Sequence, residues 1–394
     1  MLLSRRIYLT VLAATVLSVL SLVQPALALE TPASHVYLVD TTTGTVLLNK
    51  NGDQRMAPAS MSKLMTLFML FERLQDGRLS LDDKFYVSEN AWRKGGTKTG
   101  GSTMFLEPSM RVRVEDLIRG IIVQSGNDAC IVVAEALGGS EEAFAQEMTD
   151  RAHELGMTAS TFKNSTGWPD PEHRVSAHDL ARLAQLTIER FPEYYHYYSE
   201  HSFVFNGIKQ SNRNPLIYKD MGADGMKTGH TQESGYGLVG SALRKDGGKD
   251  RRLILVVNGL SSKKMRSSES ERLLEWGFRE FGNFELFKAG DVVTDAGVWL
   301  GQSASVPLII EKDLTLTLPK RARRAMKVKV SFEGPVPAPI QKGQRIGTLS
   351  ITAPDVAPVE LPLVAAEDVG QLGLVGRLGA ALDYILWGGG SHPN

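Results

Sequence analysis

The stretch Pro58-Ala-Ser-Met-Ser-Lys-Leu-Met-Thr66 says more about this chain than any other, because it holds a serine and a lysine three residues apart. Apolar side chains recur through it at helical spacing and predict a helix that begins after the proline and ends near Gly77. Residues three apart share one helix face, so Ser60 and Lys63 should lie one turn apart. Helix amides near Ser60 could also hold a developing oxyanion.

This pair indicates nucleophilic catalysis. A serine hydroxyl is a poor nucleophile without a base, and a lysine can be that base only when it is neutral. The ordinary lysine pKa of about 10.4 must therefore fall by roughly three units. Burial and a second cation both lower a lysine pKa, so we expect Lys63 to be buried, with Lys227 as the nearby cation.

Two further motifs follow in chain order. Ser125-Gly126-Asn127 lies between predicted helices at 114–124 and 128–137. Its serine can pass a proton to a leaving amine, and its asparagine can bind a substrate amide and orient the lysine base. Lys227-Thr228-Gly229 lies on a strand predicted at 225–231. Its lysine and threonine suit a carboxylate, and its glycine would let a substrate backbone approach the strand.

His230 follows the third motif directly. We expect its backbone N–H to complete the oxyanion hole, and its imidazole either tunes the site or is an ordinary edge-strand side chain. A second Lys-Thr-Gly at 98–100 lies in a glycine-rich loop without a strand pattern, so we leave it out of the site. Five other histidines are interpreted as helix-surface or loop residues: His153, His173, His178, His196 and His201. None has metal-ligand spacing, so we expect no metal and no other cofactor.

Composition narrows the functional classes. The 394 residues include 44 basic and 44 acidic side chains, a balance that gives no reason to expect nucleic acid as a partner. Cys130 is the one cysteine, which excludes an intrachain disulfide. The length favours two domains.

The N-terminus resembles an export signal. Arg5-Arg6 precedes the uncharged apolar stretch 7–23, and Ala26-Leu27-Ala28 is a small-residue cleavage site. We therefore predict a signal peptide at 1–28; an uncleaved anchor is the alternative. The arginine pair also resembles a twin-arginine signal, which we rank second.

The mature chain should form three parts. Residues 29–287 mix strands and helices and predict an α/β (α+β) domain with an antiparallel sheet and a helical cluster. Residues 288–366 alternate with period two and contain many prolines, which predicts a small all-β, sandwich-like domain. Residues 367–394 predict an amphipathic helix. Its apolar stripe consists of Leu374, Leu378, Leu382 and Ile385.

This tail is too short to span a bilayer. We expect it to lie in the membrane interface, although a helix packed on the β domain is the alternative. Arg377 is its only strong cation, so anionic lipid should add little attraction.

With its three motifs in order, the chain resembles the low-molecular-mass penicillin-binding proteins that act as D-alanyl-D-alanine carboxypeptidases. The resemblance runs from about Val36 to the C-terminus and is dense at all three motifs. It extends to Phe205-Asn-Gly-Ile208, Asn212-Arg-Asn214 and Trp276-Gly-Phe278. The family layout is a β-lactamase/transpeptidase-like domain, a small β domain and an amphipathic C-terminal anchor.

The resemblance implies a role for each matching residue. Ser60 would be acylated, Lys63 would be the base, and Ser125 and Asn127 would form the second motif. At the carboxylate end the resemblance implies Lys227, Thr228, Gly229, His230 and, by its spacing before Trp276, Arg266. Ser102 matches a serine at the rim of the site.

The implied function is removal of the terminal D-alanine from peptidoglycan stem pentapeptides, with β-lactams as covalent inhibitors. It would take place on the periplasmic side of the cytoplasmic membrane. A D,D-endopeptidase is a close alternative. A class A β-lactamase is less favoured, because Glu172, Glu189 and Glu193 lack the Glu-x-x-Leu-Asn context of its deacylating base. A wall-binding scaffold without activity is the alternative from another class.

Overall fold

The computed structural model describes residues 29–379. The predicted signal segment 1–28 lies outside the described residues. The first strand is β1 (His35–Asp40), and β2 follows at Thr45–Lys50 after a turn at Gly44.

The central sheet has five strands in the order β2-β1-β9-β8-β7, and all pairings are antiparallel. Its other members are β7 (Ala223–Thr231), β8 (Gly235–Asp246) and β9 (Lys249–Leu260). Gly247 and Gly248 take positive φ and close the hairpin of β8 and β9 within two residues. At the far side, β7 is an edge strand.

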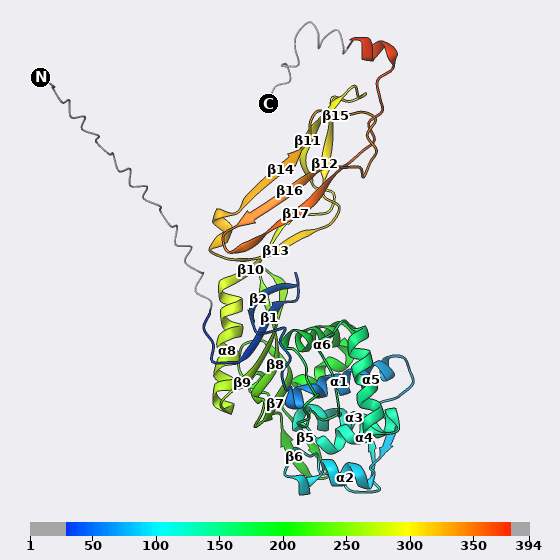
Figure 1. The fold of residues 1–394 in the computed structure, drawn as a ribbon, viewed down its shortest axis with the longest axis vertical. Coiled ribbons are helices and arrows are strands. Elements are labelled where there is room, and N and C mark those ends of the chain that lie inside the picture. The colour runs from blue at the N-terminus through cyan, green and yellow to red at the C-terminus, as the bar shows by residue number, and fades with distance from the viewer. Residues whose placement is uncertain (1–28, 380–394) are drawn as a thin grey trace, which may run out of the picture. The chain divides into compact units, whose positions relative to one another are not determined.

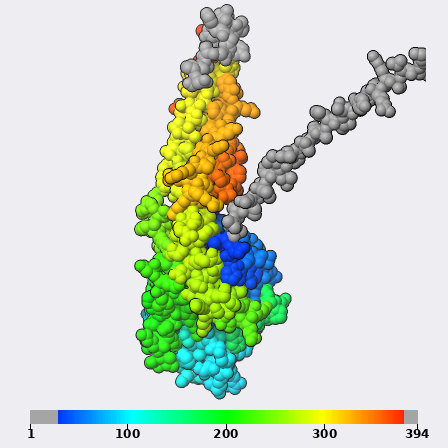
Figure 2. All heavy atoms as spheres, turned by 90° about the vertical axis from the view of Figure 1, so that its left-hand side faces the viewer, coloured from blue at the N-terminus to red at the C-terminus, as the bar shows by residue number. Residues whose placement is uncertain are grey.

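Helices cover both faces of this sheet. Helix α8 packs on one face, and the cluster that contains α1 and α6 packs on the other (Figure 1). Because both faces are covered, the run Leu253-Ile-Leu-Val-Val257 on β9 is fully buried instead of alternating. In Figure 2 the blue surface of β1 and β2 lies beside the yellow-green surface of α8, the helix that follows β9 in the chain.

The helices and short strands of this domain are α1 (Lys63–Gln75), β3 (Lys84–Tyr86), α2 (Glu89–Gly95), β4 (Arg111–Arg113), α3 (Val114–Arg119), α4 (Asn127–Gly138), α5 (Glu141–Glu154), α6 (Ala177–Arg190), α7 (Pro192–Tyr195), β5 (Ser202–Phe205), β6 (Ile208–Ser211) and α8 (Lys263–Glu280). Ser176 caps α6 through a bond from Asp179 N, as its sequence predicts. The predicted helix 114–124 instead changes after Arg119 into a π-helical turn at Gly120–Gln124.

A second, all-β domain follows. Its strands are β10 (Phe281–Phe287), β11 (Val292–Trp299), β12 (Ser305–Ile309), β13 (Leu314–Pro319), β14 (Lys327–Phe332), β15 (Val336–Pro337), β16 (Arg345–Ala353) and β17 (Val356–Ala365). Six form one sheet in the order β14-β16-β17-β12-β11-β15, while β10 pairs with β13. Leu308, Leu349 and Leu363 are fully buried in its core.

The described part of the tail is short. Residues 374–379 are helical, and the side chains of Leu374 and Leu378 are 79% and 67% exposed. Leu382 and Ile385 lie outside the described residues. Across 29–379, no helix combines the length and apolar character needed to cross a membrane.

Candidate active site

Ser60 lies on a 3₁₀ turn, Ala59–Ser62, and not on the first α-helical turn that its sequence predicts. Ala59 has φ +48°, a left-handed conformation that is strained for a residue with a side chain. The turn leads directly into α1, where Lys63 is the first residue. The predicted juxtaposition is nevertheless present, because Lys63 Nζ lies 2.9 Å from Ser60 Oγ.

Lys63 is fully buried, as the proposed chemistry requires. Its ammonium also donates to Asn127 Oδ1 at 2.8 Å and to the Thr166 carbonyl at 2.5 Å. Burial is the main cause that lowers its pKa, to about 8. The charge of Arg213 also lowers this pKa. Lys227 is the other buried cation of the site, and the mutual repulsion of the two lysines is seen in the lowered pKa of Lys227.

The second and third motifs meet in the same place. Lys227 is 1% exposed and donates to Ser125 Oγ at 2.9 Å. Burial, followed by the charge on Lys63, lowers the pKa of Lys227 well below its ordinary value. In the described part of the chain neither lysine has an ion-pair partner, so two buried ammonium groups in one site would be costly. The site thus favours a state in which at least one lysine is neutral.

The second motif is held by a residue that the sequence analysis missed. Asp128 is fully buried, and its carboxylate accepts bonds from Thr103 Oγ1 at 2.5 Å and from the backbone N–H of Met104 at 2.9 Å. Asn127 N also donates to the Ser102 carbonyl at 2.8 Å. These bonds fix the predicted rim serine beside α4. An aspartate in the first turn of a helix is the signal that could have indicated this role.

Packing inside the protein is a further reason for a glycine at position 229. A Cβ at this position would lie 2.8 Å from the Pro58 carbonyl oxygen and 3.2 Å from Ala59 Cβ. The glycine therefore lets β7 pack against the turn that carries Ser60. The approach of a substrate backbone to the strand at Gly229 remains a prediction.

Arg266, expected at the carboxylate end, lies on the first turn of α8, which begins at Lys263. Arg266 is 7% exposed, and burial lowers its pKa to about 10. Its Nη1 lies 3.5 Å from the Gly229 carbonyl, while its Nε is buried without a hydrogen-bond partner in the described chain. Thr228, on β7, is also buried.

Arg213 is the second residue that sequence reasoning missed. It belongs to the segment Asn212-Arg-Asn214 that resembles the family, but nothing in that segment indicated a role for the arginine side chain. The exposed guanidinium donates to Ser102 Oγ and lowers the pKa values of Lys63 and Lys227. The site therefore has an excess of cations, which suits an anionic substrate.

His230 is exposed, and its ring packs on that of Tyr236 with centroids 3.9 Å apart. Partial burial, followed by the charges of Arg266 and Lys263, lowers its pKa. The imidazole is thus neutral near pH 7. Because β7 is an edge strand, part of its backbone is unpaired, and the oxyanion role of the His230 N–H remains a prediction.

Two other sequence interpretations can be compared with the structure. The Lys-Thr-Gly at 98–100 lies on an exposed 3₁₀ turn, Thr97–Thr99, outside any strand, as its context predicts. His173 lies in a loop, one of the two predicted environments, but its side chain is buried and not at the surface. His173 is 2% exposed and hydrogen-bonds to Ser62 Oγ at 2.7 Å, and burial lowers its pKa to about 4.

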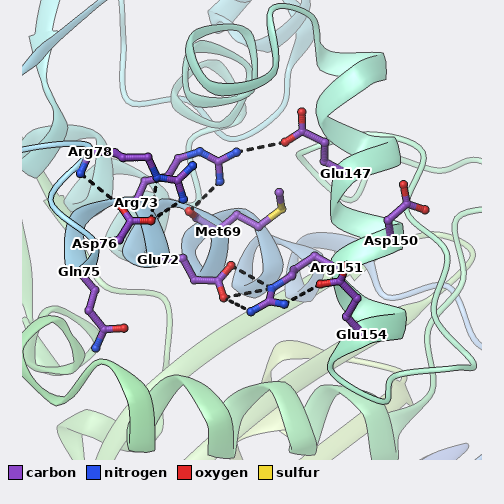
Figure 3. A pocket seen from close by; sticks show the side chains of 10 residues that line it. All are labelled: Met69, Glu72, Arg73, Gln75, Asp76, Arg78, Glu147, Asp150, Arg151 and Glu154. Carbon is purple, nitrogen blue, oxygen red and sulfur yellow. Dashed lines mark hydrogen bonds and ion pairs between the residues drawn. The ribbon is translucent and has the colours of Figure 1, made fainter.

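A charged hollow between α1 and α5 is separate from this site. Figure 3 shows its lining residues: Met69, Glu72, Arg73, Gln75, Asp76, Arg78, Glu147, Asp150, Arg151 and Glu154. Each arginine is ion-paired, for example Arg73 with Glu147 at 3.1 Å. No motif residue lines the hollow, so the chemistry belongs to the Ser60 site.

Comparison with known proteins decides the family. A profile of the D-alanyl-D-alanine carboxypeptidase family, peptidase S11, matches residues 22–262, more than half of the chain. The chain belongs to this D-alanyl-D-alanine carboxypeptidase family. A profile of the penicillin-binding protein 5 C-terminal domain matches residues 281–371 and so accounts for the all-β domain.

Individual members of the carboxypeptidase family are similar over most of the chain. D-alanyl-D-alanine carboxypeptidase DacD of Escherichia coli (strain K12) is 38% identical over 352 residues, which cover 89% of this chain and 90% of the relative. The crystal structure of DacD from Francisella tularensis has a TM-score of 0.77 and 32% identity, covering 87% of this chain and 95% of that one. Penicillin-binding protein 5 from Haemophilus influenzae has a TM-score of 0.73 and 36% identity, with coverage of 87% and 98%.

Family membership confirms the predicted fold class and activity. This carboxypeptidase is a penicillin-binding serine hydrolase that works through an acyl-enzyme. Its mixed helix and sheet domain carries all three motifs, and its second domain is all-β.

Proposed function

We propose that this carboxypeptidase removes the terminal D-alanine of peptidoglycan stem pentapeptides with Ser60 as nucleophile and Lys63 as base. The observation that carries the proposal is the 2.9 Å contact between Lys63 Nζ and Ser60 Oγ at a buried site. Neutral Lys63 takes the hydroxyl proton while Oγ attacks the carbonyl carbon of the D-Ala-D-Ala bond. D-Alanine leaves, and water then hydrolyses the Ser60 ester.

The other motif residues have separate roles in this proposal. Ser125 returns a proton to the leaving amine, supported by its contact with Lys227. Asn127 uses Oδ1 to orient Lys63, which leaves its Nδ2 to donate to the substrate amide. The backbone N–H groups of Ser60 and His230 stabilise the oxyanion.

A β-lactam would acylate the same serine and remain attached. A class A β-lactamase removes such an adduct with a glutamate base, but here Glu172 is exposed and ion-paired with Lys163 at 2.9 Å. The Thr166 carbonyl, and no carboxylate, contacts Lys63 from this loop. Purified protein should therefore release D-alanine from diacetyl-Lys-D-Ala-D-Ala and hold a penicilloyl adduct for minutes. Rapid nitrocefin hydrolysis without D-alanine release would favour the lactamase alternative.

We expect Arg266→Ala to weaken cleavage of a peptide acid far more than cleavage of its C-terminal amide. Buried Arg266, with its unpartnered Nε, is proposed to bind the terminal carboxylate together with Thr228 and Lys227. A charge-assisted hydrogen bond contributes roughly 1.5–3 kcal/mol, so kcat/KM for the acid should fall by about 10- to 150-fold. Steady-state kinetics on the two matched peptides measures the difference.

Lys263→Ala is the control for this experiment, because Lys263 is exposed on the same helical turn and carries the same charge. It should change both rates little. An equal loss on acid and amide for Arg266→Ala would assign Arg266 a structural role, and a selective loss for Lys263→Ala would move the carboxylate contact to that residue.

We also propose that residues 1–28 direct export and are removed, and that the tail holds the enzyme on the periplasmic face of the cytoplasmic membrane. The sequence of the signal supports the first part. The exposed side chains of Leu374 and Leu378, and their continuation in the apolar stripe, support the second. N-terminal sequencing of the exported protein should begin at Leu29.

Mature protein should cosediment with phospholipid vesicles, and deletion of 370–394 should abolish this while peptide cleavage continues. Arg377 is offset in charge by Asp383, so apolar burial must dominate, and binding should resist salt but yield to detergent. The matched point variant is Leu374→Glu/Leu378→Glu. If full-length mature protein stays in the supernatant, the tail is a packing helix and the anchor proposal is wrong.

A further inference from the structure

An exposed tryptophan stands at the mouth of the Ser60 site. Trp168 is 38% exposed, and the two residues before it belong to the wall of the site. The Thr166 carbonyl accepts a bond from Lys63, and Gly167, with φ +81°, touches the turn that carries Ser60. A Cβ at Gly167 would lie 1.9 Å from the Ala59 carbonyl oxygen and 3.1 Å from Ser60 N. The chain therefore reaches Trp168 directly from the nucleophile and its base.

Hydrogen bonds between the Asn164 side chain and the backbone fix the position of Trp168. Asn164 Oδ1 accepts bonds from Gly167 N at 2.8 Å and Trp168 N at 3.0 Å, and Asn164 Nδ2 donates to the Trp168 carbonyl at 3.1 Å. One side chain thus clamps both ends of this short turn. A large exposed apolar side chain on a clamped turn suits a contact surface.

The ring of Trp168 reaches the opposite wall. A Cβ built on Gly101 would lie 3.8 Å from Trp168 Cζ2 and 2.9 Å from Asn127 Nδ2, the amide nitrogen proposed to bind substrate. The indole therefore lies between the Ser60 turn and the loop that leads into Ser102. Within residues 29–379, no described contact joins it to Thr228 or Arg266, the expected carboxylate end.

We infer that Trp168 forms the wall of a subsite for the aliphatic side chain of the residue that precedes the two D-alanines. This inference rests on the proposed function. With the terminal carboxylate at Arg266 and the substrate amide at Asn127 Nδ2, as proposed above, the preceding residues of the peptide would continue toward Gly101, where a Cβ would lie 2.9 Å from that nitrogen. A long straight side chain, such as that of a dibasic amino acid, can cover the indole face there, whereas an alanine side chain is too short.

Two peptides that differ only in this residue test the inference: diacetyl-L-Lys-D-Ala-D-Ala and acetyl-L-Ala-D-Ala-D-Ala. In Trp168→Ala, the ratio of kcat/KM for the lysyl peptide to kcat/KM for the alanyl peptide should fall about tenfold from its wild-type value, mainly through KM. Trp168→Phe, which keeps an aromatic face, should restore most of the ratio. Trp299→Ala is the matched control, since Trp299 is 37% exposed but lies on the β domain.

An unchanged ratio in Trp168→Ala, or equal losses on both peptides, would overturn the subsite. Failure of the proposed function is distinguishable from this result, because wild-type protein would then release D-alanine from neither peptide. A fall in the ratio that Trp299→Ala reproduces would also contradict the inference.

Discussion

Replacement of Lys63 with methionine should slow acylation by benzylpenicillin about 10²–10⁴-fold, the contribution expected of a general base. Methionine keeps most of the buried stem of Lys63 but cannot accept the Ser60 proton across the 2.9 Å contact. The variant loses the bonds to Asn127 Oδ1 and the Thr166 carbonyl but leaves no buried charge unpaired, so it should be less stable than wild type and still fold. Stopped-flow labelling and circular dichroism measure the two effects.

The rate of acylation should also depend on pH, and the pKa of Lys63 sets the direction of that dependence. Burial holds the pKa of Lys63 at about 8, so the neutral base becomes more abundant as pH rises from 6 towards 9, and acylation should accelerate over that range. Lys63→Met should lose this rise. Lys98→Met is the control, because Lys98 belongs to the exposed Lys-Thr-Gly outside the site. A wild-type rate that is flat with pH, or a Lys63→Met variant as fast as wild type, would contradict the assignment of the base.

The largest expected loss of stability lies away from the catalytic residues. Asp40, at the end of β1, is fully buried and accepts a bond from Arg251 Nε at 2.7 Å. Arg251 also donates to the Phe281 carbonyl at 2.8 Å, so the pair joins β1 and β9 to the start of β10. Asp40→Ala removes the fully buried carboxylate of this pair and leaves the buried arginine with the longer 3.5 Å contact to Asp246 Oδ2. It should lower the free energy of unfolding by about 3–5 kcal/mol.

Asp250→Ala is the matched control for this prediction. Asp250 pairs with Lys245 at 2.8 Å in the same hairpin, but both side chains are at least 60% exposed. Its removal should cost about 0–1 kcal/mol. Urea unfolding of the two variants measures the difference, and equal losses of stability would mean that the buried pair has no special role.

Local patterns predicted the elements whose signals lie within one segment. The limits of β1, the cap at Ser176 and the helices α5 and α6 follow from periodicity and capping residues close in sequence. The start of α8 could not be predicted in this way, because the charged residues Lys263, Lys264 and Arg266 interrupt the apolar periodicity in its first turns. Ser262, whose side chain accepts a bond from Met265 N, was the available signal.

The parts of the site that could not be predicted depend on tertiary contacts. Arg213 reaches Ser102 across 111 positions in the sequence, and nothing local to Arg213 indicates that contact. The contact of Gly229 with the turn at Pro58 and Ala59 likewise joins segments that lie far apart in the sequence. The motifs indicated which residues meet, whereas the added effect of the Arg213 charge on Lys63 depends on tertiary packing.

The measurement that tests the central claim most directly is mass spectrometry of the protein after reaction with benzylpenicillin, with the adduct mapped by peptide. One penicilloyl group per chain should be found, on the peptide that contains Ser60, and Ser60→Ala should carry none. An adduct that persists in Ser60→Ala, or one that maps to Ser125, would contradict the assignment of the nucleophile.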